Sequence, residues 1–324
     1  MHSVEIRLSS LHFIGLSVGL LAAVTACESS KLEPQAEALA PFTIELRDRQ
    51  PEDAFTAVYP VNGGHLVWLG AKHANRTDSL TFQLIETAYS AFKFETVIVE
   101  GCPASWEPNA QRLIAYARAG AAEEKDGFQP RGEIVPAALG ALNEGAAIYC
   151  GEPEDEDLKS RVLKQGIQAL DLLGFYTMRS IPQWIREQKI VDAADPAIGA
   201  LLEKELARNR GRLGLADTVL PTVDAWREWY QATNGKALGA DFSTEEAGPL
   251  ADGPFGSNTV AAAISRARAV FLHEIVLSHL NDDQTVLVVF GASHLMIHRP
   301  ALDATLGAPC YAGEALGDAV ALCN

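Results

Sequence analysis

Four short runs of apolar, largely β-branched residues constrain the fold of this chain more than any other feature of its sequence. Each run ends in a small or polar residue: Gly70, Glu100, Cys150 or Gly291. Such runs are typical of buried strands, and apolar side chains on both strand faces are what a parallel sheet covered by helices requires. The expected strands are 65–69, 96–99, 146–149 and 285–290.

The segments between these runs have the periodicity of helices. Apolar residues recur at helical spacing in about 82–92, 158–173 and 260–275. About 177–256 differs, because it contains helix-like stretches rich in Trp and Arg, followed by a loop rich in Gly and Pro. The alternation predicts an α/β fold with a mostly parallel central sheet flanked by helices. We expect residues 177–256 to form a helical insertion or cap on that sheet.

The first 26 residues have the pattern of an export signal. Arg7 precedes an uncharged apolar stretch at 11–24, which is shorter than the ~20 residues that span a bilayer. Residues 24–27 (Val-Thr-Ala-Cys) resemble the bacterial lipobox, which implies that Cys27 is lipidated and becomes the mature N-terminus. The alternative is an ordinary cleavable signal with an incidental cysteine.

This interpretation sets the expected organisation and location of the chain. After the signal at 1–26, residues 27–45 form a polar tether and 46–324 form a single α/β domain. Glu28, rather than an aspartate, follows the cysteine. We therefore expect a lipid-anchored protein at the periplasmic face of the outer membrane.

The charge balance excludes one class of partner. The chain has 26 Lys and Arg against 42 Asp and Glu, a formal net charge of −16. An acidic surface repels phosphate backbones, so nucleic acid is not an expected partner. Membrane attachment has to come from the N-terminal lipid anchor rather than from a basic face. The expected partner is a small-molecule or peptide substrate.

Four cysteines remain after Cys27. An even number in an oxidising compartment indicates disulfides, and four cysteines allow three pairings. We favour Cys102–Cys150, because these residues follow strands that are candidates for neighbours, together with Cys310–Cys323. The alternative is that these cysteines are free buried thiols.

Polar residues gather where the expected strands end. His73 follows the first strand, Glu100 the second, Glu152 the third and His294 the last. Ligands of open parallel sheets bind beyond the carboxyl ends of the strands, so these side chains are expected at one edge. Two histidines and a carboxylate form a common catalytic metal set. Each residue alone has an ordinary alternative, a hydrogen-bonded loop histidine or a surface acid.

The motifs Gly70-Ala-Lys-His73 and Gly291-Ala-Ser-His294, with Glu100 in VIVEG between them, resemble the TIKI/TraB group. That group belongs to a superfamily with the erythromycin esterases and the ChaN-type haem-binding lipoproteins. The resemblance implies an α/β fold and, in the TIKI branch, metal-dependent peptide hydrolysis. It assigns His73, Glu100 and His294 as ligands of a divalent metal (Mn, Co or Zn). Ala71 stands where the esterases carry an acidic residue.

Arg268 lies in SRAR, which resembles the arginine helix of the esterase-like branch, with Ala269 in place of its aspartate. The position also follows from helical spacing, since Arg268 comes four residues after Ile264 and three before Phe271. An arginine beside a buried stripe needs a carboxylate, and Glu100 or Glu152 is the natural partner. The alternative is an arginine whose head reaches solvent at the edge of the stripe.

Three functions follow from these observations. The first is a metal-dependent envelope hydrolase of peptide or ester bonds, with Glu152 as general base or added ligand and Arg268 binding an anion or steadying a carboxylate. The second is a ChaN-like lipoprotein that binds haem or iron without catalysis. The third is a degenerate member kept as an interaction protein. Asp171, Tyr176 and Arg179 are further candidates to line the pocket.

Overall fold

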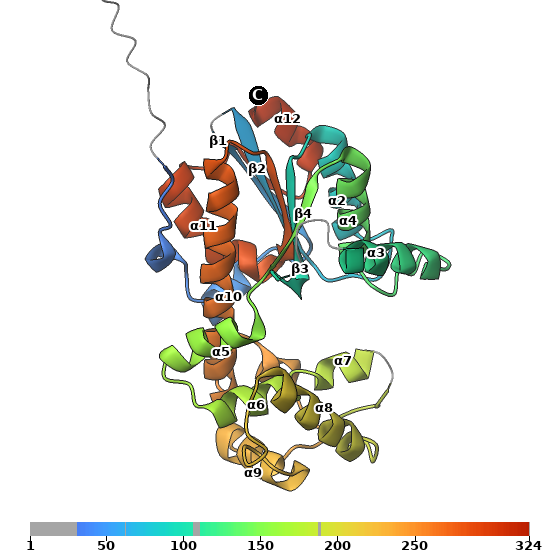
Figure 1. The fold of residues 1–324 in the computed structure, drawn as a ribbon, viewed down its shortest axis with the longest axis vertical. Coiled ribbons are helices and arrows are strands. Elements are labelled where there is room, and N and C mark those ends of the chain that lie inside the picture. The colour runs from blue at the N-terminus through green and yellow to red at the C-terminus, as the bar shows by residue number, and fades with distance from the viewer. Residues whose placement is uncertain (1–30, 62, 106–110, 187–188, 324) are drawn as a thin grey trace, which may run out of the picture. The chain divides into compact units, whose positions relative to one another are not determined.

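The computed structural model describes residues 31–61, 63–105, 111–186 and 189–323, built around one six-stranded sheet. The expected signal at 1–26 and Cys27 lie outside the described residues. The strand order is β4-β3-β5-β2-β1-β6 (Figure 1). The strands are β1 Phe55–Val61, β2 Gly64–Ala71, β3 Thr96–Pro103, β4 Ala147–Glu152, β5 Val286–Gly291 and β6 Tyr311–Gly313.

Four neighbouring strands form the parallel part of the sheet. β3 pairs in parallel with both β4 and β5, and β5 pairs in parallel with β2. On the other side of β2, β1 and β6 add two antiparallel pairings. The α/β fold with a mostly parallel sheet is therefore confirmed, and its four expected strands are β2 to β5. The sequence did not predict β1 or β6.

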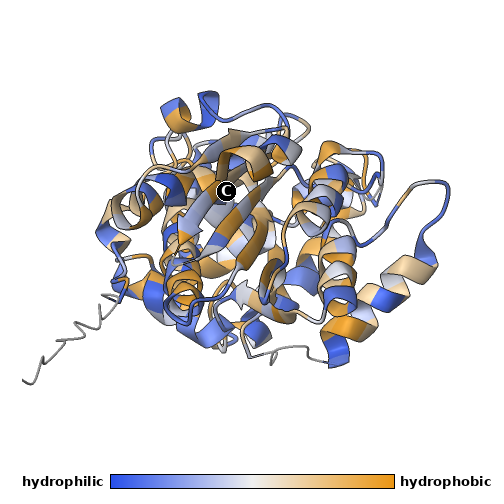
Figure 2. Ribbon diagram, turned by 90° about the horizontal axis from the view of Figure 1, so that it is seen from above, coloured by the Kyte–Doolittle hydropathy of each residue, from blue (hydrophilic) through white to orange (hydrophobic). Residues whose placement is uncertain are grey.

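Helices cover both faces of the sheet (Figure 1). Alternate strand residues supply two apolar layers: Val67 and Leu69 belong to one cluster, while Leu66 and Trp68 belong to the other. Figure 2 shows hydrophobic residues on the strands, surrounded by helices of mixed character. On one face lie α2 (Leu80–Ala91), α3 (Gln111–Glu123) and α4 (Ile134–Glu144), and on the other α10 (Gly256–Asn281) and α11 (Ala292–Leu306).

A cluster of helices between β4 and α10 has a hydrophobic core of its own. Leu202, Trp226 and Tyr230 are fully buried in it, and Val260 and Ile264 of α10 complete it. The expected insertion at 177–256 begins earlier than predicted, because Leu158 already belongs to this core. The helices are α5 (Asp155–Lys164), α6 (Ala169–Met178), α7 (Ile181–Arg186), α8 (Ile198–Arg212) and α9 (Val223–Asn234).

The remaining described elements are short. They are η1 (Ala36–Ala38), α1 (Ile44–Asp48), η2 (Thr244–Ala247), η3 (Leu316–Asp318) and α12 (Ala319–Cys323). Over the described part of the chain, no helix combines the length and apolarity needed to cross a membrane.

Both favoured disulfides are present. Cys102 of β3 and Cys150 of β4 are bonded, with 5.1 Å between their Cα atoms, as expected for neighbouring strands. Cys310 and Cys323 form the second bond, which ties β6 and its flanking turn to α12. The first disulfide lies at the carboxyl edge of the sheet, where the expected polar residues converge.

Candidate active site

The carboxyl ends of the four parallel strands gather polar side chains around Glu100. His73 follows β2, Glu100 lies near the end of β3, and Glu152 is the last residue of β4. His294 lies in the first turn of α11, directly after β5. Since β4, β3, β5 and β2 are consecutive in the sheet, one edge presents all four residues. This convergence is the basis of the candidate site.

Glu100 sits at an irregularity in its strand. The pairing of β3 with β4 shifts register between Val99 and Pro103, and Gly101 has a φ of +92°, a conformation that favours glycine. The Oε2 atom of Glu100 accepts a hydrogen bond of 2.6 Å from the Gly291 backbone N–H. A Cβ at position 291 would stand 3.1 Å from the His73 Nε2 atom. Glycine at 291 therefore lets β5 approach both side chains.

The two histidines face the same carboxylate from different strands. The Nε2 atom of His73 lies 4.0 Å from Oε2 of Glu100, and Nε2 of His294 lies 3.9 Å from Oε1. The His73 side chain is 65% exposed, whereas that of His294 is 5% exposed. One imidazole is thus open to an incoming molecule, and the other forms the buried wall of the site.

Glu133 holds the exposed histidine in place. Its Oε1 atom lies 2.5 Å from Nδ1 of His73, which leaves Nε2 directed toward Glu100. Hydrogen bonding to Glu133 raises the pKa of His73 to about 9. A carboxylate on the far nitrogen is the usual support for a metal-binding or catalytic imidazole. Glu133 was not expected from the sequence, because it precedes α4 and follows no strand.

His294 has the opposite electrostatic setting. Burial, reinforced by the charge of Arg268, lowers the pKa of His294 to about 4, so its imidazole is neutral at pH 7. Its Nδ1 atom is buried and has no hydrogen-bond partner among the described residues. The site therefore combines a charged, exposed imidazole with a neutral, buried one.

Arg268 joins the two glutamates of the site. Its Nε atom donates to Oε2 of Glu152 at 2.7 Å, and its Nη2 atom donates to Oε1 of Glu152 and, at 2.5 Å, to Oε1 of Glu100. Burial by itself would raise the pKa of Glu100, but the positive charge of Arg268, and after it the two histidines, lowers this pKa by more than burial raises it. The net pKa of Glu100 is well below its ordinary value, so this carboxylate is ionised at neutral pH.

The side chains present are of the kinds that bind divalent ions, and each histidine lies close enough to Glu100 to share an ion with it. Two ligands that each lie ~2.0–2.2 Å from one ion are at most about 4.4 Å apart. The His73–Glu100 and His294–Glu100 separations fall under this limit. Over the described ranges, however, no three His, Cys, Asp or Glu side chains form a ready-made metal site.

Two pockets open beside these residues and meet at Gly101 and Cys102. The larger, of about 750 Å³, is here named the histidine pocket; it is lined by His73, Glu100 and Glu133 and by the exposed rings of Tyr116 and Phe128. The smaller, of about 400 Å³, is here named the arginine pocket. Its polar lining consists of Glu152, Asp155, Tyr176, Arg179, Arg212 and Arg268.

The expectations for the α6 residues are met in part. Tyr176 and Arg179 line the arginine pocket. Asp171 does not line it; its Oδ1 atom instead accepts a hydrogen bond of 2.9 Å from the Trp229 indole inside the helical cluster. Asp171 therefore has a structural contact, and the prediction that it faces the pocket is wrong.

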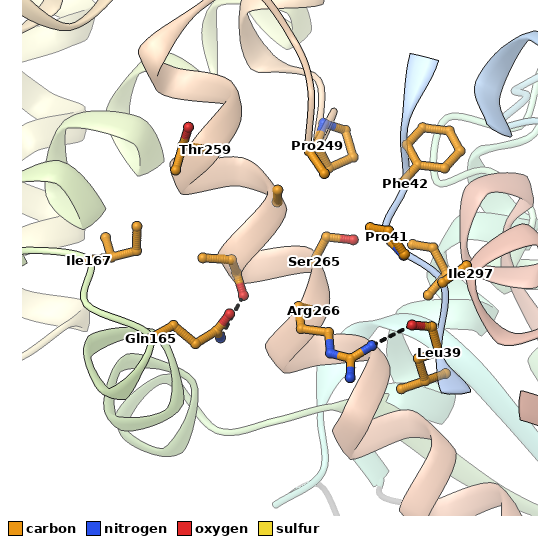
Figure 3. A pocket seen from close by; sticks show the side chains of 14 residues that line it. Leu39, Pro41, Phe42, Gln165, Ile167, Pro249, Thr259, Ser265, Arg266 and Ile297 are labelled. Atoms are coloured by element: carbon orange, nitrogen blue, oxygen red, sulfur yellow. Dashed lines mark hydrogen bonds between the residues drawn. The ribbon is translucent and has the colours of Figure 1, made fainter. Parts of the chain in front are cut away.

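A third pocket, of about 490 Å³, lies beside α10 and the segment before α1 (Figure 3). Arg266 donates to the Leu39 carbonyl at 2.7 Å, and Gln165 donates to the Ala263 carbonyl at 3.0 Å. Apolar side chains such as Phe42 and Ile297 make up much of the remaining lining. None of its described lining residues is a histidine or an acid.

Comparisons with known proteins add no identification to this geometry. No family model matches the chain, and no curated protein or solved structure is similar to it at a significant level. The functional assignment therefore depends on the side chains at the sheet edge.

Proposed function

We propose that this chain is a bacterial envelope hydrolase that cleaves acyl bonds, either peptide or ester, with the help of a divalent ion. One observation carries the proposal: the Nε2 atoms of His73 and His294 both lie within 4.0 Å of the Glu100 carboxylate. The resemblance to the TIKI/TraB group, which supplied the expectation of Mn, Co or Zn, points in the same direction.

In this proposal His73, Glu100 and His294 would hold the ion, and His73 would release the proton on its Nε2 atom as the ion binds. When bound, a divalent ion supplies Lewis acidity, which polarises an acyl oxygen and lowers the pKa of water. Glu133 keeps the His73 ring oriented through Nδ1. Arg268 fixes the Glu100 carboxylate and prevents its rotation away from the histidines.

The contacts of Glu152 make it less available as a general base or metal ligand than the sequence suggested. Both of its oxygens accept hydrogen bonds from Arg268, which leaves it less free to take a proton from water. Its role as general base stays a prediction. We assign Glu152 first to neutralising Arg268, so that the arginine does not repel the ion.

The experiment is a hydrolysis assay on peptide and ester panels, with the full chain supplied in turn with Mn, Co and Zn. We expect Glu100→Gln to lower turnover at least a hundredfold in protein that is still folded under the assay conditions, although loss of this partner of Arg268 also lowers the urea midpoint. The matched control is Glu274→Gln, because Glu274 lies on α10 with a 45% exposed side chain and its one ion pair among the described residues is with Arg161, at 3.4 Å. Equal turnover in Glu100→Gln and Glu274→Gln would remove the proposal.

A second candidate, haem binding without catalysis, is favoured by a different observation. Tyr116 is 40% exposed and Phe128 is 49% exposed, and both line the histidine pocket beside the open ring of His73. Exposed aromatic rings beside an accessible imidazole suit a planar aromatic ligand. Titration with haem tests this candidate: a Soret shift that His73→Ala abolishes supports it, and an unchanged spectrum removes it.

A further inference from the structure

The arginine pocket has a charge pattern that the proposed hydrolytic chemistry does not use. Three arginines line it: Arg179 at the end of α6, Arg212 at the end of α8 and Arg268 on α10. The lining acids are Glu152 and Asp155. This makes the wall cationic by one charge, in a chain whose formal net charge is −16.

Two of the three arginines are already paired. Arg268 is held by Glu152 and Glu100. Arg212 donates from Nε and Nη2 to the two carboxylate oxygens of Asp155, at 2.6 Å and 2.5 Å. Both acids that line the pocket, Glu152 and Asp155, are therefore already paired with Arg268 and Arg212.

Arg179 has no such partner. No ion pair or side-chain hydrogen bond of Arg179 occurs among the described residues, and the residue is exposed. Its guanidinium carbon lies 5.2 Å from the centre of the Tyr176 ring, and that of Arg212 lies 5.3 Å from the same centre. Tyr176 is 3% exposed, so its buried ring is a fixed neighbour of both guanidinium groups.

We propose that the arginine pocket binds an anionic group, a carboxylate or a phosphate, and that Arg179 is its anchoring residue. A planar guanidinium with unused N–H donors matches an oxyanion with two parallel hydrogen bonds. Arg212, whose guanidinium lies near the same Tyr176 ring, also lines this pocket. The pocket meets the histidine pocket at Gly101 and Cys102. Resting on the proposed function, this makes the substrate an acyl compound with an acidic group near the bond that is cleaved.

The first test measures anion binding by calorimetry, using the full chain with inorganic phosphate in one arm and succinate in the other. The matched pair of variants is Arg179→Gln and Arg227→Gln, since Arg227 is an exposed arginine of α9 that lines none of these pockets. Loss of a charge-assisted contact weakens binding roughly tenfold to a hundredfold. We expect that loss in Arg179→Gln only, with an unchanged urea midpoint. The arm that binds more tightly identifies the anion.

Equal affinity in both variants, or no binding of either anion at low salt, overturns the proposal. A second measurement separates this failure from failure of the hydrolase. With an acidic substrate, Arg179→Gln should raise KM at least tenfold with little change in kcat, and Glu100→Gln should still bind the anion. Anion binding through Arg179 without any hydrolysis would remove the hydrolase and keep the pocket. Hydrolysis of the acidic substrate with an unchanged KM in Arg179→Gln would remove the anion pocket and keep the hydrolase.

Discussion

Replacing Arg268 with methionine should destabilise the fold more than the same replacement of Arg161, an arginine of α5 whose ion-pair partners are exposed. The Arg268 side chain is 17% exposed, and its partners Glu100 and Glu152 are 19% and 16% exposed. Methionine retains the length and apolar bulk of the arginine stem but removes the guanidinium. The partly buried carboxylates of Glu100 and Glu152 are then left without their cation. Among the described residues, Glu100 keeps the hydrogen bond from the Gly291 backbone N–H.

The size of the effect follows from these contacts. Each pair at about 4 Å is worth ~4 kcal/mol at an effective dielectric constant of about 20, before the cost of desolvating the arginine is subtracted. Removing one partner of a buried pair costs about 3–5 kcal/mol. We therefore expect Arg268→Met to lower the free energy of unfolding by about 3–5 kcal/mol at pH 7.

Urea unfolding of the full chain with its disulfides intact measures this change. Arg161→Met is the control, because Arg161 lies in α5 with ion pairs to Asp157 and Glu274 that are 44% and 45% exposed. Exposed pairs of this kind contribute about 0–1 kcal/mol. Adding Glu152→Gln to Arg268→Met should recover part of the lost stability. A loss no greater than that of Arg161→Met, or a double variant no more stable than the single one, would refute the reasoning.

Two further predictions concern the interior and the disulfides. His273 is fully buried, its ring nitrogens have no partner among the described residues, and burial lowers its pKa to about 4. The unfolded chain, with a His pKa near 6.5, binds more protons between pH 6.5 and 4, so stability is lost as pH falls through this window. Between pH 7.5 and 5.5 the free energy of unfolding should fall by about 1 kcal/mol less in His273→Leu than in the unaltered chain. Urea unfolding at each pH measures this difference, and an identical decrease in both proteins would contradict the prediction. Replacing Cys102 and Cys150 by serine should cost about 4 kcal/mol, and replacing Cys310 and Cys323 about 3 kcal/mol, because the first pair is separated by 48 residues and the second by 13. The opposite order of urea midpoints would contradict the loop-length argument.

The parallel half of the fold was predictable because its strands are apolar on both faces. β5, for example, is buried at every position, and such a run has few alternatives in a chain with helical patterns on either side. β1 lacked this signal because Pro60 interrupts its apolar pattern, and β6 has only three residues. The apolar spacing at 158–173 predicted a helix there, but spacing alone does not show which core a helix joins, so the packing of α5 in the helical cluster was not foreseen.

The candidate site was predictable to the extent that its residues directly follow strands. His73, Glu100, Glu152 and His294 obey this rule, and the expectation that a carboxylate meets Arg268 followed from its position beside a buried stripe. Glu133 was not predictable in this way, because it lies in a turn 60 residues beyond His73 and reaches His73 only through folding. The pairing of Arg212 with Asp155, which leaves Arg179 as the available cation of the described pocket lining, likewise depends on the packing of three helices.

The most direct test of the central claim is elemental analysis of the full chain, purified without a polyhistidine tag after growth with Mn, Co and Zn. Ligands spread over several strands bind an ion only when folding brings them together, so its retention reports their convergence. We expect about one divalent ion per chain, and its loss in a His73→Ala variant that still unfolds cooperatively in urea, at a lower midpoint. Absence of any ion in the unaltered chain, or equal content in the variant, would contradict the account.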